Sequence, residues 1–385
     1  MKGLRSFLDK IKPSFQKGGK FQFLHSTFDA FETFLFVPDK VTHRGTHIRD
    51  SIDLKRTMSI VILALIPALL FGMYNVGYQY YKATGQDAAF FEMFWFGFLK
   101  VIPIVIVSYV SGLAVEFMFA QIRHHDVNEG FLVSGMLIPL VMPVNIPLWM
   151  VAVATIFAVI FGKEVFGGTG MNVFNPALLT RAFIFFAYPK NISGDLPWTF
   201  GLPQHIHTVD GFSGATPLAN AASYAIDKIP DNWTLFVGLI PGSIGETSKA
   251  AILIGAIILL LTGVANWRVM FSVVFGGIFM SGILNLFAVN AYMSITPLTH
   301  LLMGGFLFGA VFMATDPVTA AQTNTGKYIF GFLVGVFAIL IRVLNPAYPE
   351  GMMLSILLMN AFAPLIDHYV IQANIKRRLK RVKAN

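Results

Sequence analysis

Long apolar stretches with very few charges dominate this 385-residue chain. Only 12% of its residues are charged, whereas 55% are hydrophobic, and the mean hydropathy is +0.66. Soluble proteins carry a much larger share of charged residues, roughly 25%. Most of the chain is therefore expected to lie in lipid, and its 34 glycines agree with the close helix packing found in membranes.

The apolar stretches divide into ten predicted membrane spans of roughly 17–25 residues. These spans cover residues 57–80, 92–120, 131–146, 147–166, 172–188, 250–265, 267–290, 297–315, 327–345 and 352–372. The spans form two groups of five, 57–188 and 250–372, with a polar break (189–249) between them. A polar N-terminal segment (1–56) precedes the first group, and a basic tail (373–385) follows the second. Ten spans put both basic termini on one side, which the positive-inside rule makes cytoplasmic, so the polar break is expected outside.

Two short spans that end at proline, residues 130–143 and 305–317, indicate an internal repeat. Each half of the chain holds five spans, and an odd number forces the second half to insert upside down. Inverted repeats with interrupted spans indicate a site at the membrane midplane between the halves. The sequence therefore predicts an all-α polytopic membrane protein with ten transmembrane helices in two inverted five-helix repeats.

Several functions are excluded by what the sequence lacks. The net charge of +8 sits at the two ends and reports orientation, so no nucleic-acid partner is expected. There is no cysteine for a disulfide, a thiolate zinc site or an iron–sulfur cluster, and no metal is expected other than a possible Na⁺. Without a dinucleotide fingerprint or P-loop, this chain is not expected to oxidise NADH or to use ATP to drive transport.

Phenylalanines recur near helical spacing in the N-terminal segment, at Phe28, Phe31, Phe34 and Phe36. This pattern is typical of an amphipathic segment that lies on a membrane or against a partner subunit. A small packed cytoplasmic cap is an equally good interpretation.

Residues 210–216 in the polar break form a candidate modification motif. It consists of Asp210, Gly211, Phe212, Ser213, Gly214, Ala215 and Thr216. The Thr216 hydroxyl is flanked by small residues and followed by Pro217, so we expect it to be exposed on an extended backbone. Another enzyme could reach and esterify such a hydroxyl. The alternative is an ordinary Gly/Ser turn between helices.

Residues 167–176 are rich in glycine and asparagine. Backbone groups near Gly168 and Gly170, with the amides of Asn172 and Asn175, offer the donors and acceptors that a planar heterocycle needs. The alternative is a helix start with an asparagine cap and a proline in the first turn.

Three carboxylates in or near the spans are candidates for an ion path: Glu116, Asp316 and Asp367. Carboxylates in membranes are costly, and a hard cation such as Na⁺ prefers oxygen ligands. The alternative is that each acid pairs with Arg or Lys, as Asp367 would with the basic tail. Glu164 is expected in a loop ion pair.

Two further residues have open roles. Arg181 is expected to face a phosphate or a carboxylate, or to extend to the interface. Gly112 leaves room for a flat ring, although close helix packing is the simpler explanation.

The motif at residues 210–216 resembles the signal at which a flavin transferase joins FMN, through its phosphate, to threonine. The membrane subunits of the sodium-pumping NADH:quinone reductase and their Rnf relatives carry this signal. Residues 167–176, 128–131 and 315–317 add to the resemblance, which covers nearly the whole chain. The N-terminal run of residues 42–56 resembles the B subunit of the sodium-translocating reductase more than the shorter D subunit of Rnf complexes.

The resemblance implies covalent FMN on Thr216, non-covalent riboflavin near Asn172 and Asn175, and reduction of ubiquinone or menaquinone coupled to Na⁺ movement. It also implies a bacterial inner-membrane complex with an NADH-oxidising subunit that holds FAD and iron–sulfur, a second FMN-carrying subunit, and a flavin transferase for maturation. The implied fold is similar to that of urea-transporter-type channels. The resemblance makes Gly112 the candidate for the quinone site, although Leu113 stands where the family tends to show a second glycine.

Two other functions remain open. One is a D-type subunit of an Rnf ferredoxin:NAD oxidoreductase. The other is a passive inverted-repeat channel or transporter without a redox role, because interrupted spans and a high glycine content suit it equally well.

Overall fold

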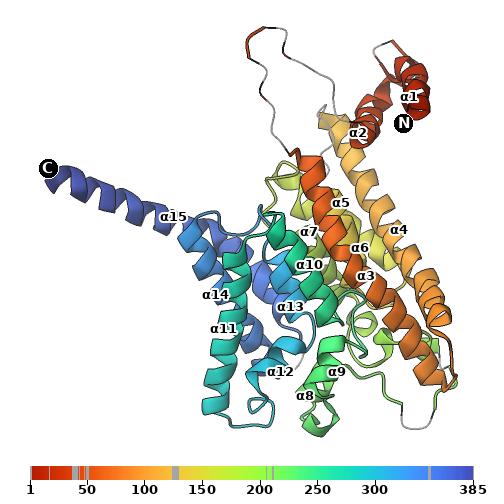
Figure 1. Ribbon diagram of the computed structural model, residues 1–385, viewed down its shortest axis with the longest axis vertical. Coiled ribbons are helices and arrows are strands. Elements are labelled where there is room, and N and C mark those ends of the chain that lie inside the picture. Colours follow the sequence, from red (N-terminus) through yellow and green to blue (C-terminus); the bar gives the residue numbers. More distant parts are fainter. Residues whose placement is uncertain are drawn as a thin grey trace.

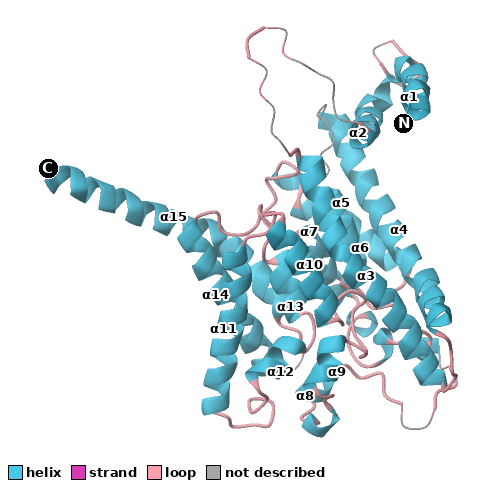
Figure 2. Cartoon of the chain, in the orientation of Figure 1, coloured by secondary structure: helices cyan, strands magenta, loops and turns pink. Residues whose placement is uncertain are grey.

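Helices are the only regular secondary structure in the part of the chain that the computed structural model describes, and loops join them (Figure 2). The model describes residues 2–16, 18–36, 42, 44–46, 48, 52–123, 130–204, 206–209, 212–345 and 348–384. No strand occurs among these residues, which confirms the all-α fold class.

Six helices are long and apolar enough to cross a membrane. They are α3 (Leu54–Thr84), α4 (Phe90–Arg123), α6 (Leu148–Gly162, extended by a short turn), α11 (Trp267–Leu286), α14 (Asn324–Leu344) and α15 (Met352–Ala384). Three shorter apolar helices lie among them: α5 (Phe131–Leu140), α7 (Pro176–Ala187) and α10 (Lys249–Leu261).

The eighth predicted span is not one continuous helix. It is divided into α12 (Pro297–Leu302), α13 (Phe306–Phe308) and the π-helical turn η7 (Gly309–Met313). Gly304 joins the first two pieces with a φ of +60°, a backbone conformation that favours glycine. The count of ten spans and the inverted repeat are therefore not confirmed by helix length, and both stay predictions.

Polar side chains mark where these helices begin. The Asp53 carboxylate accepts a hydrogen bond from the Arg56 backbone N–H at the start of α3, and the Ser248 hydroxyl accepts one from Ala251 at the start of α10. Such caps satisfy backbone donors that have no partner within the helix.

The two ends of the bundle differ. The N-terminus, the start of α3 and the end of α4 lie at one end, and α8 (Pro217–Ala222), α9 (Asn232–Val237) and α12 lie at the other (Figure 1). The C-terminus extends from the first of these ends, so both termini lie on the same side, in agreement with the predicted topology.

The N-terminal segment forms a packed pair of helices, α1 (Lys2–Phe15) and α2 (His25–Leu35). Phe15 stacks on Phe28 with ring centroids 4.7 Å apart, and Lys12 Nζ lies 2.8 Å from Glu32 Oε1. The Gln121 amide of α4 donates to the Thr27 hydroxyl over 3.3 Å. These contacts favour the packed cap over an isolated amphipathic segment, although the side chains of Phe31 and Phe34 lie outside the described residues.

Two half-length pieces of helix are seated in the same way. A Cβ on Gly112 of α4 would lie 1.9 Å from Cζ of Phe131, the first residue of α5. A Cβ on Gly277 of α11 would lie 2.5 Å from Cζ of Phe306, the first residue of α13. Each half of the chain thus holds a glycine on a long helix against the leading phenylalanine of a shorter piece of helix. The ring of Phe131 fills the space beside Gly112, as helix packing predicts.

Glycines also set the distance between α11 and α14. A Cβ on Gly276 would lie 2.2 Å from the Phe332 carbonyl oxygen, closer than any real contact. Gly276→Ala is expected to destabilise the protein by about 1–3 kcal/mol, because the helices must move apart. The measurement is thermal unfolding in detergent.

Gly282→Ala on the same helix is the matched control, since nothing lies within 4 Å of its Cβ position. It is expected to leave the unfolding temperature unchanged or slightly raised, because alanine favours helix more than glycine does. Equal destabilisation by both variants would contradict the packing assignment.

Candidate functional site

Two cavities lie at the two ends of α10. The first, called the Thr216 cavity, has a volume of about 90 Å³, and Lys249 at the start of α10 lines it. The second, called the Asp316 cavity, has a volume of about 140 Å³, and Leu259 near the end of α10 lines it. With a rise of about 1.5 Å per residue, the two cavities are roughly 15 Å apart along this helix.

The half-helices enter from opposite cavities. Gly130, just before α5, lines the Asp316 cavity, and Gly305, just before α13, lines the Thr216 cavity. Helix starts that point in from both sides agree with the predicted inverted repeat.

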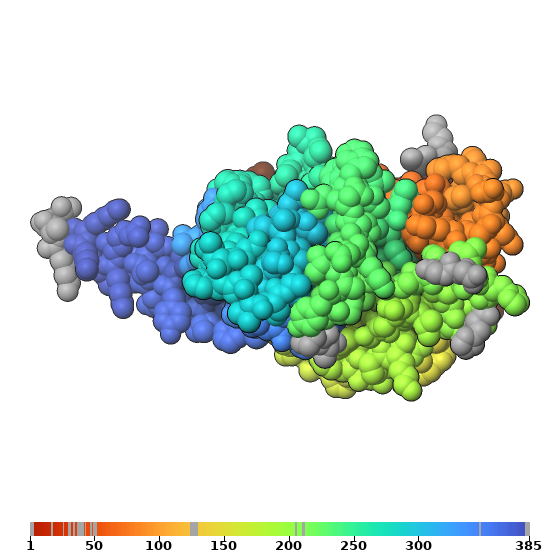
Figure 3. All heavy atoms as spheres, turned by 90° about the horizontal axis from the view of Figure 1, so that it is seen from below, coloured from red at the N-terminus to blue at the C-terminus, as the bar shows by residue number. Residues whose placement is uncertain are grey.

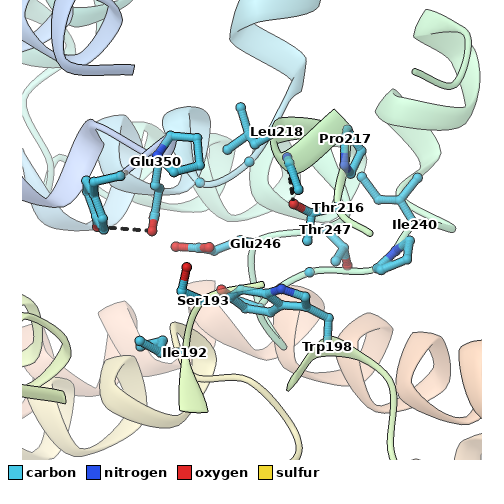
Figure 4. Close-up of a pocket in the computed structure, with 18 of the residues that line it drawn as sticks. Ile192, Ser193, Trp198, Thr216, Pro217, Leu218, Ile240, Glu246, Thr247 and Glu350 are labelled. Atoms are coloured by element: carbon cyan, nitrogen blue, oxygen red, sulfur yellow. Dashed lines mark hydrogen bonds between the residues drawn. The ribbon is translucent and has the colours of Figure 1, made fainter. Parts of the chain in front are cut away.

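Thr216 lies at the edge of the first cavity (Figure 4). Its backbone is extended, with φ −75° and ψ 156°, and it caps α8 by accepting a hydrogen bond from the Ala219 N–H over 3.1 Å. That bond uses a lone pair of Oγ1 and leaves the hydroxyl proton free for replacement. The predicted extended path is confirmed, but the predicted exposure is wrong, because Thr216 caps α8 beside the cavity and is half-buried.

The rest of the motif is partly visible. Asp210 and Gly211 lie outside the described residues. Ser213 is exposed, and its hydroxyl accepts a hydrogen bond from the Ala215 N–H over 3.2 Å. Gly214 is buried, and a Cβ there would lie 2.4 Å from the Asp195 carbonyl oxygen, so only glycine fits without a backbone shift.

A buried ion cluster forms one wall of the Thr216 cavity. Arg181 Nη1 lies 2.8 Å from Glu246 Oε1, and Arg181 Nη2 pairs with Glu350. Arg181 therefore faces carboxylates, one of the roles that the sequence left open. Glu246 and Glu350 were missed by sequence reasoning, because each is a single loop acid without a motif.

Two more buried cations hold the backbone of this wall. The Lys249 ammonium donates to the carbonyl oxygens of Glu246, Thr247 and Gly304 over 2.6, 3.1 and 2.9 Å. Arg342 donates to the carbonyls of His300, Met303 and Glu350 around the end of α12. Both cations are 0% exposed. They satisfy carbonyls that the broken helices leave without helical partners.

Two hydroxyls lining the Thr216 cavity lack hydrogen-bond partners in the described structure. Ser243 Oγ and Thr247 Oγ1 belong to residues only 3% exposed. Buried polar atoms are normally paired, so these two suit a polar ligand.

Asn175 and Asp316 meet in the second cavity. The Asn175 amide donates to Asp316 Oδ2 over 3.2 Å, while its oxygen caps α7 by accepting from the Ala177 N–H over 3.0 Å. Asp316 also accepts from the Val318 N–H and the Thr319 hydroxyl. The capping alternative is thus correct for Asn175, but the residue also joins the two halves of the chain.

The other residues predicted to bind a heterocycle have different positions relative to the Asp316 cavity. Asn172 lines the Asp316 cavity, and its amide donates to the Phe174 carbonyl over 3.3 Å. Gly168 and Gly170 have φ of +95° and +90° and shape the loop, and neither lines this cavity.

The other two acids have structural partners. Glu116 forms a buried ion pair with Lys163, which lines the Asp316 cavity. Asp367 accepts hydrogen bonds from the backbone N–H groups of Gln322 and Thr323 at the start of α14. Glu164 is in an ion pair, as predicted, but its partner is Arg123 over 3.4 Å and not the neighbouring Lys163, which pairs with Glu116.

Removing one member of the Glu116–Lys163 pair is expected to be costly. Lys163→Met should lower the free energy of unfolding by about 3–5 kcal/mol, because it takes the ammonium partner from a buried carboxylate. Thermal unfolding of both single variants and of the Glu116→Gln, Lys163→Met double variant tests this, with the exposed Lys190→Met as control. A double variant less stable than Lys163→Met would contradict the pairing.

The fold and its two cavities define a polytopic helical membrane protein whose broken helices meet around polar sites. Residues 41–376 match the model of the NQR2, RnfD, RnfE family, and the chain belongs to this family. It is 48% identical to the B subunit of the Na(+)-translocating NADH-quinone reductase of Ectopseudomonas mendocina, over 98% of this chain and 99% of that protein. It is 47% identical to the same subunit of Azotobacter vinelandii and of Pseudomonas aeruginosa (strain LESB58), with the same coverage.

Proposed function

We propose that the chain is the membrane subunit of a Na⁺-translocating NADH:quinone oxidoreductase that carries covalent FMN on Thr216. The observation that carries the proposal is the position of Thr216, on an extended backbone at the rim of a cavity with unpaired buried hydroxyls. The names of the similar proteins support the same activity over nearly the full length of the chain. They favour this function over an Rnf-type subunit.

The residues of the Thr216 cavity fit a flavin joined through its phosphate. Thr216 would hold the phosphoester, and the hydroxyls of Ser243 and Thr247 would donate to the polar edge of the ring system. The indole of Trp198 lies beside them as an apolar wall (Figure 4). When bound, the flavin supplies the electron-transfer chemistry, and the protein supplies position and electrostatics.

The Asp316 cavity would take the non-covalent riboflavin and the transported ion. Asn172 lines this cavity, and its side-chain amide can form hydrogen bonds with a heterocycle bound there. Asp316 contributes a carboxylate at the end of a broken helix, where backbone carbonyls are also available, and these are the oxygen ligands that Na⁺ prefers. Glu116 and Asp367 are weaker candidates for the ion path. Glu116 already forms an ion pair with the Lys163 ammonium, and Asp367 accepts hydrogen bonds at the start of α14.

The proposed orientation puts both termini in the cytoplasm of a bacterium with the chain in its inner membrane. Arg123 and Lys163 lie at the same end of the bundle as the termini, which agrees with the positive-inside rule. The Thr216 cavity then opens to the outer side, and the quinone is reduced nearer the inner side. Electrons arrive from the NADH-oxidising FAD and iron–sulfur subunit and the second FMN-carrying subunit of the complex.

The covalent flavin is tested by the mass of the peptide that contains Thr216. Protein produced with the flavin transferase and then denatured should show an increment of one FMN on that peptide, and Thr216→Ala should lose it. Thr296→Ala is a matched control, because Thr296 also caps a helix through its hydroxyl and precedes proline at the same end of the bundle. An unmodified Thr216 peptide would leave the passive channel as the better explanation.

The ion path is tested by the Na⁺ dependence of quinone reduction in the assembled complex. Asp316→Asn removes a charged oxygen ligand and is expected to raise the half-saturating Na⁺ concentration on the order of tenfold, which corresponds to about 1.4 kcal/mol. Asp231→Asn, an exposed helix cap at the other end, is the control and should leave it unchanged. An unaltered Na⁺ dependence in Asp316→Asn would remove this residue from the path.

A further inference from the structure

The last helix is longer than a membrane requires. α15 has 33 residues, which corresponds to about 50 Å, whereas the hydrocarbon core of a bilayer is about 30 Å thick. About 20 residues counted from Met352 are enough to span the hydrocarbon core, so the helix is expected to reach the membrane surface near Ile371. Asp367, just before this point, holds the start of α14 through its hydrogen bonds and fixes α15 to the bundle.

Beyond Asp367 the helix leaves the bundle. It projects sideways, across rather than along the direction of α11, and the view from below shows the same projection (Figure 1, Figure 3). Every residue from 371 to 381 is exposed. This part of α15, residues 368–384, is called the C-terminal arm below.

The arm carries an apolar stripe. Ile371, Ile375 and Leu379 are four residues apart and lie on one face of the helix, with exposed fractions of 48%, 43% and 56%. The arm also holds six basic residues and no acidic one: Lys376, Arg377, Arg378, Lys380, Arg381 and Lys383. Most of these lie on the faces away from the stripe. A basic helix with an apolar face is typical of segments that lie in a membrane interface.

We propose that the C-terminal arm lies on the surface of the membrane and binds anionic lipid headgroups. The stripe would enter the boundary between headgroups and acyl chains, and the lysines and arginines would contact the lipid phosphates. Three observations favour lipid as the occupant: the arm continues directly from a membrane-spanning helix, it projects sideways from the end of the bundle at which the N-terminus also lies, and its charge is complementary to an anionic surface.

The absence of cysteine from the chain makes a direct test simple. Ile375→Cys in the full chain places a polarity-sensitive fluorophore on the stripe. Ala373→Cys places it two residues away, about 200° around the helix on the exposed polar face, as a matched control. Each labelled protein is placed in nanodiscs of phosphatidylcholine alone, or of phosphatidylcholine with phosphatidylglycerol.

The expected result is a blue shift of the Ile375→Cys label, with loss of quenching by aqueous iodide, in the discs that contain phosphatidylglycerol. The Ala373→Cys label should remain quenched in both kinds of disc. An Ile375→Cys label with the same emission and quenching in both discs would overturn the proposal. So would labels that shift equally at both positions, because the arm would then have no lipid-facing side.

A charge variant separates lipid from other causes. Arg377→Gln, Lys380→Gln and Arg381→Gln together should abolish the effect of phosphatidylglycerol on the Ile375→Cys label. Lys82→Gln, Lys190→Gln and Lys228→Gln together remove three charges elsewhere and should leave it intact. A shift that appears only in the assembled complex, with phosphatidylcholine alone, would mean that a protein partner covers the arm and would overturn the proposal.

Discussion

Broken helices in a membrane leave carbonyl oxygens that no water can satisfy, and the architecture depends on how this chain satisfies them. Lys249 and Arg342, both fully buried, donate to carbonyls on the loop before α10, at the end of α12 and before α15. These cations hold three separate stretches of backbone together. The wall of the Thr216 cavity exists because its backbone is fixed in this way.

Polar contacts also join the two halves of the chain. Asn175, at the start of α7, reaches Asp316 in the second half, and Arg181 of the same helix pairs with Glu246 and Glu350. Apolar side chains alone give little preference for one helix arrangement over another in lipid, whereas these contacts are specific. The short helix α7 therefore connects to the second half at both cavities.

Much of the fold could be predicted from the sequence, since the predicted spans overlap all six long helices and the cap at Asn175 follows from an Asn-Pro pair. The eighth span was predicted as one stretch over residues 297–315, and the interruption at Gly304 was missed although the Gly304-Gly305 pair is a signal for a turn. The partners of Arg181, Glu246 and Glu350, could not be predicted, because they are 65 and 169 residues away in sequence. The pairing of such isolated charges depends on how the helices pack.

Helix α10 forms part of the wall of both cavities, with Lys249 at one and Leu259 at the other. An α-helix is stiff along its axis, because every turn is braced by hydrogen bonds to the next. The two cavities are therefore lined in part by the same rigid helix. A displacement of α10 along its axis moves the residues that line the Thr216 cavity and the residues that line the Asp316 cavity by the same amount. The two cavities are therefore mechanically linked.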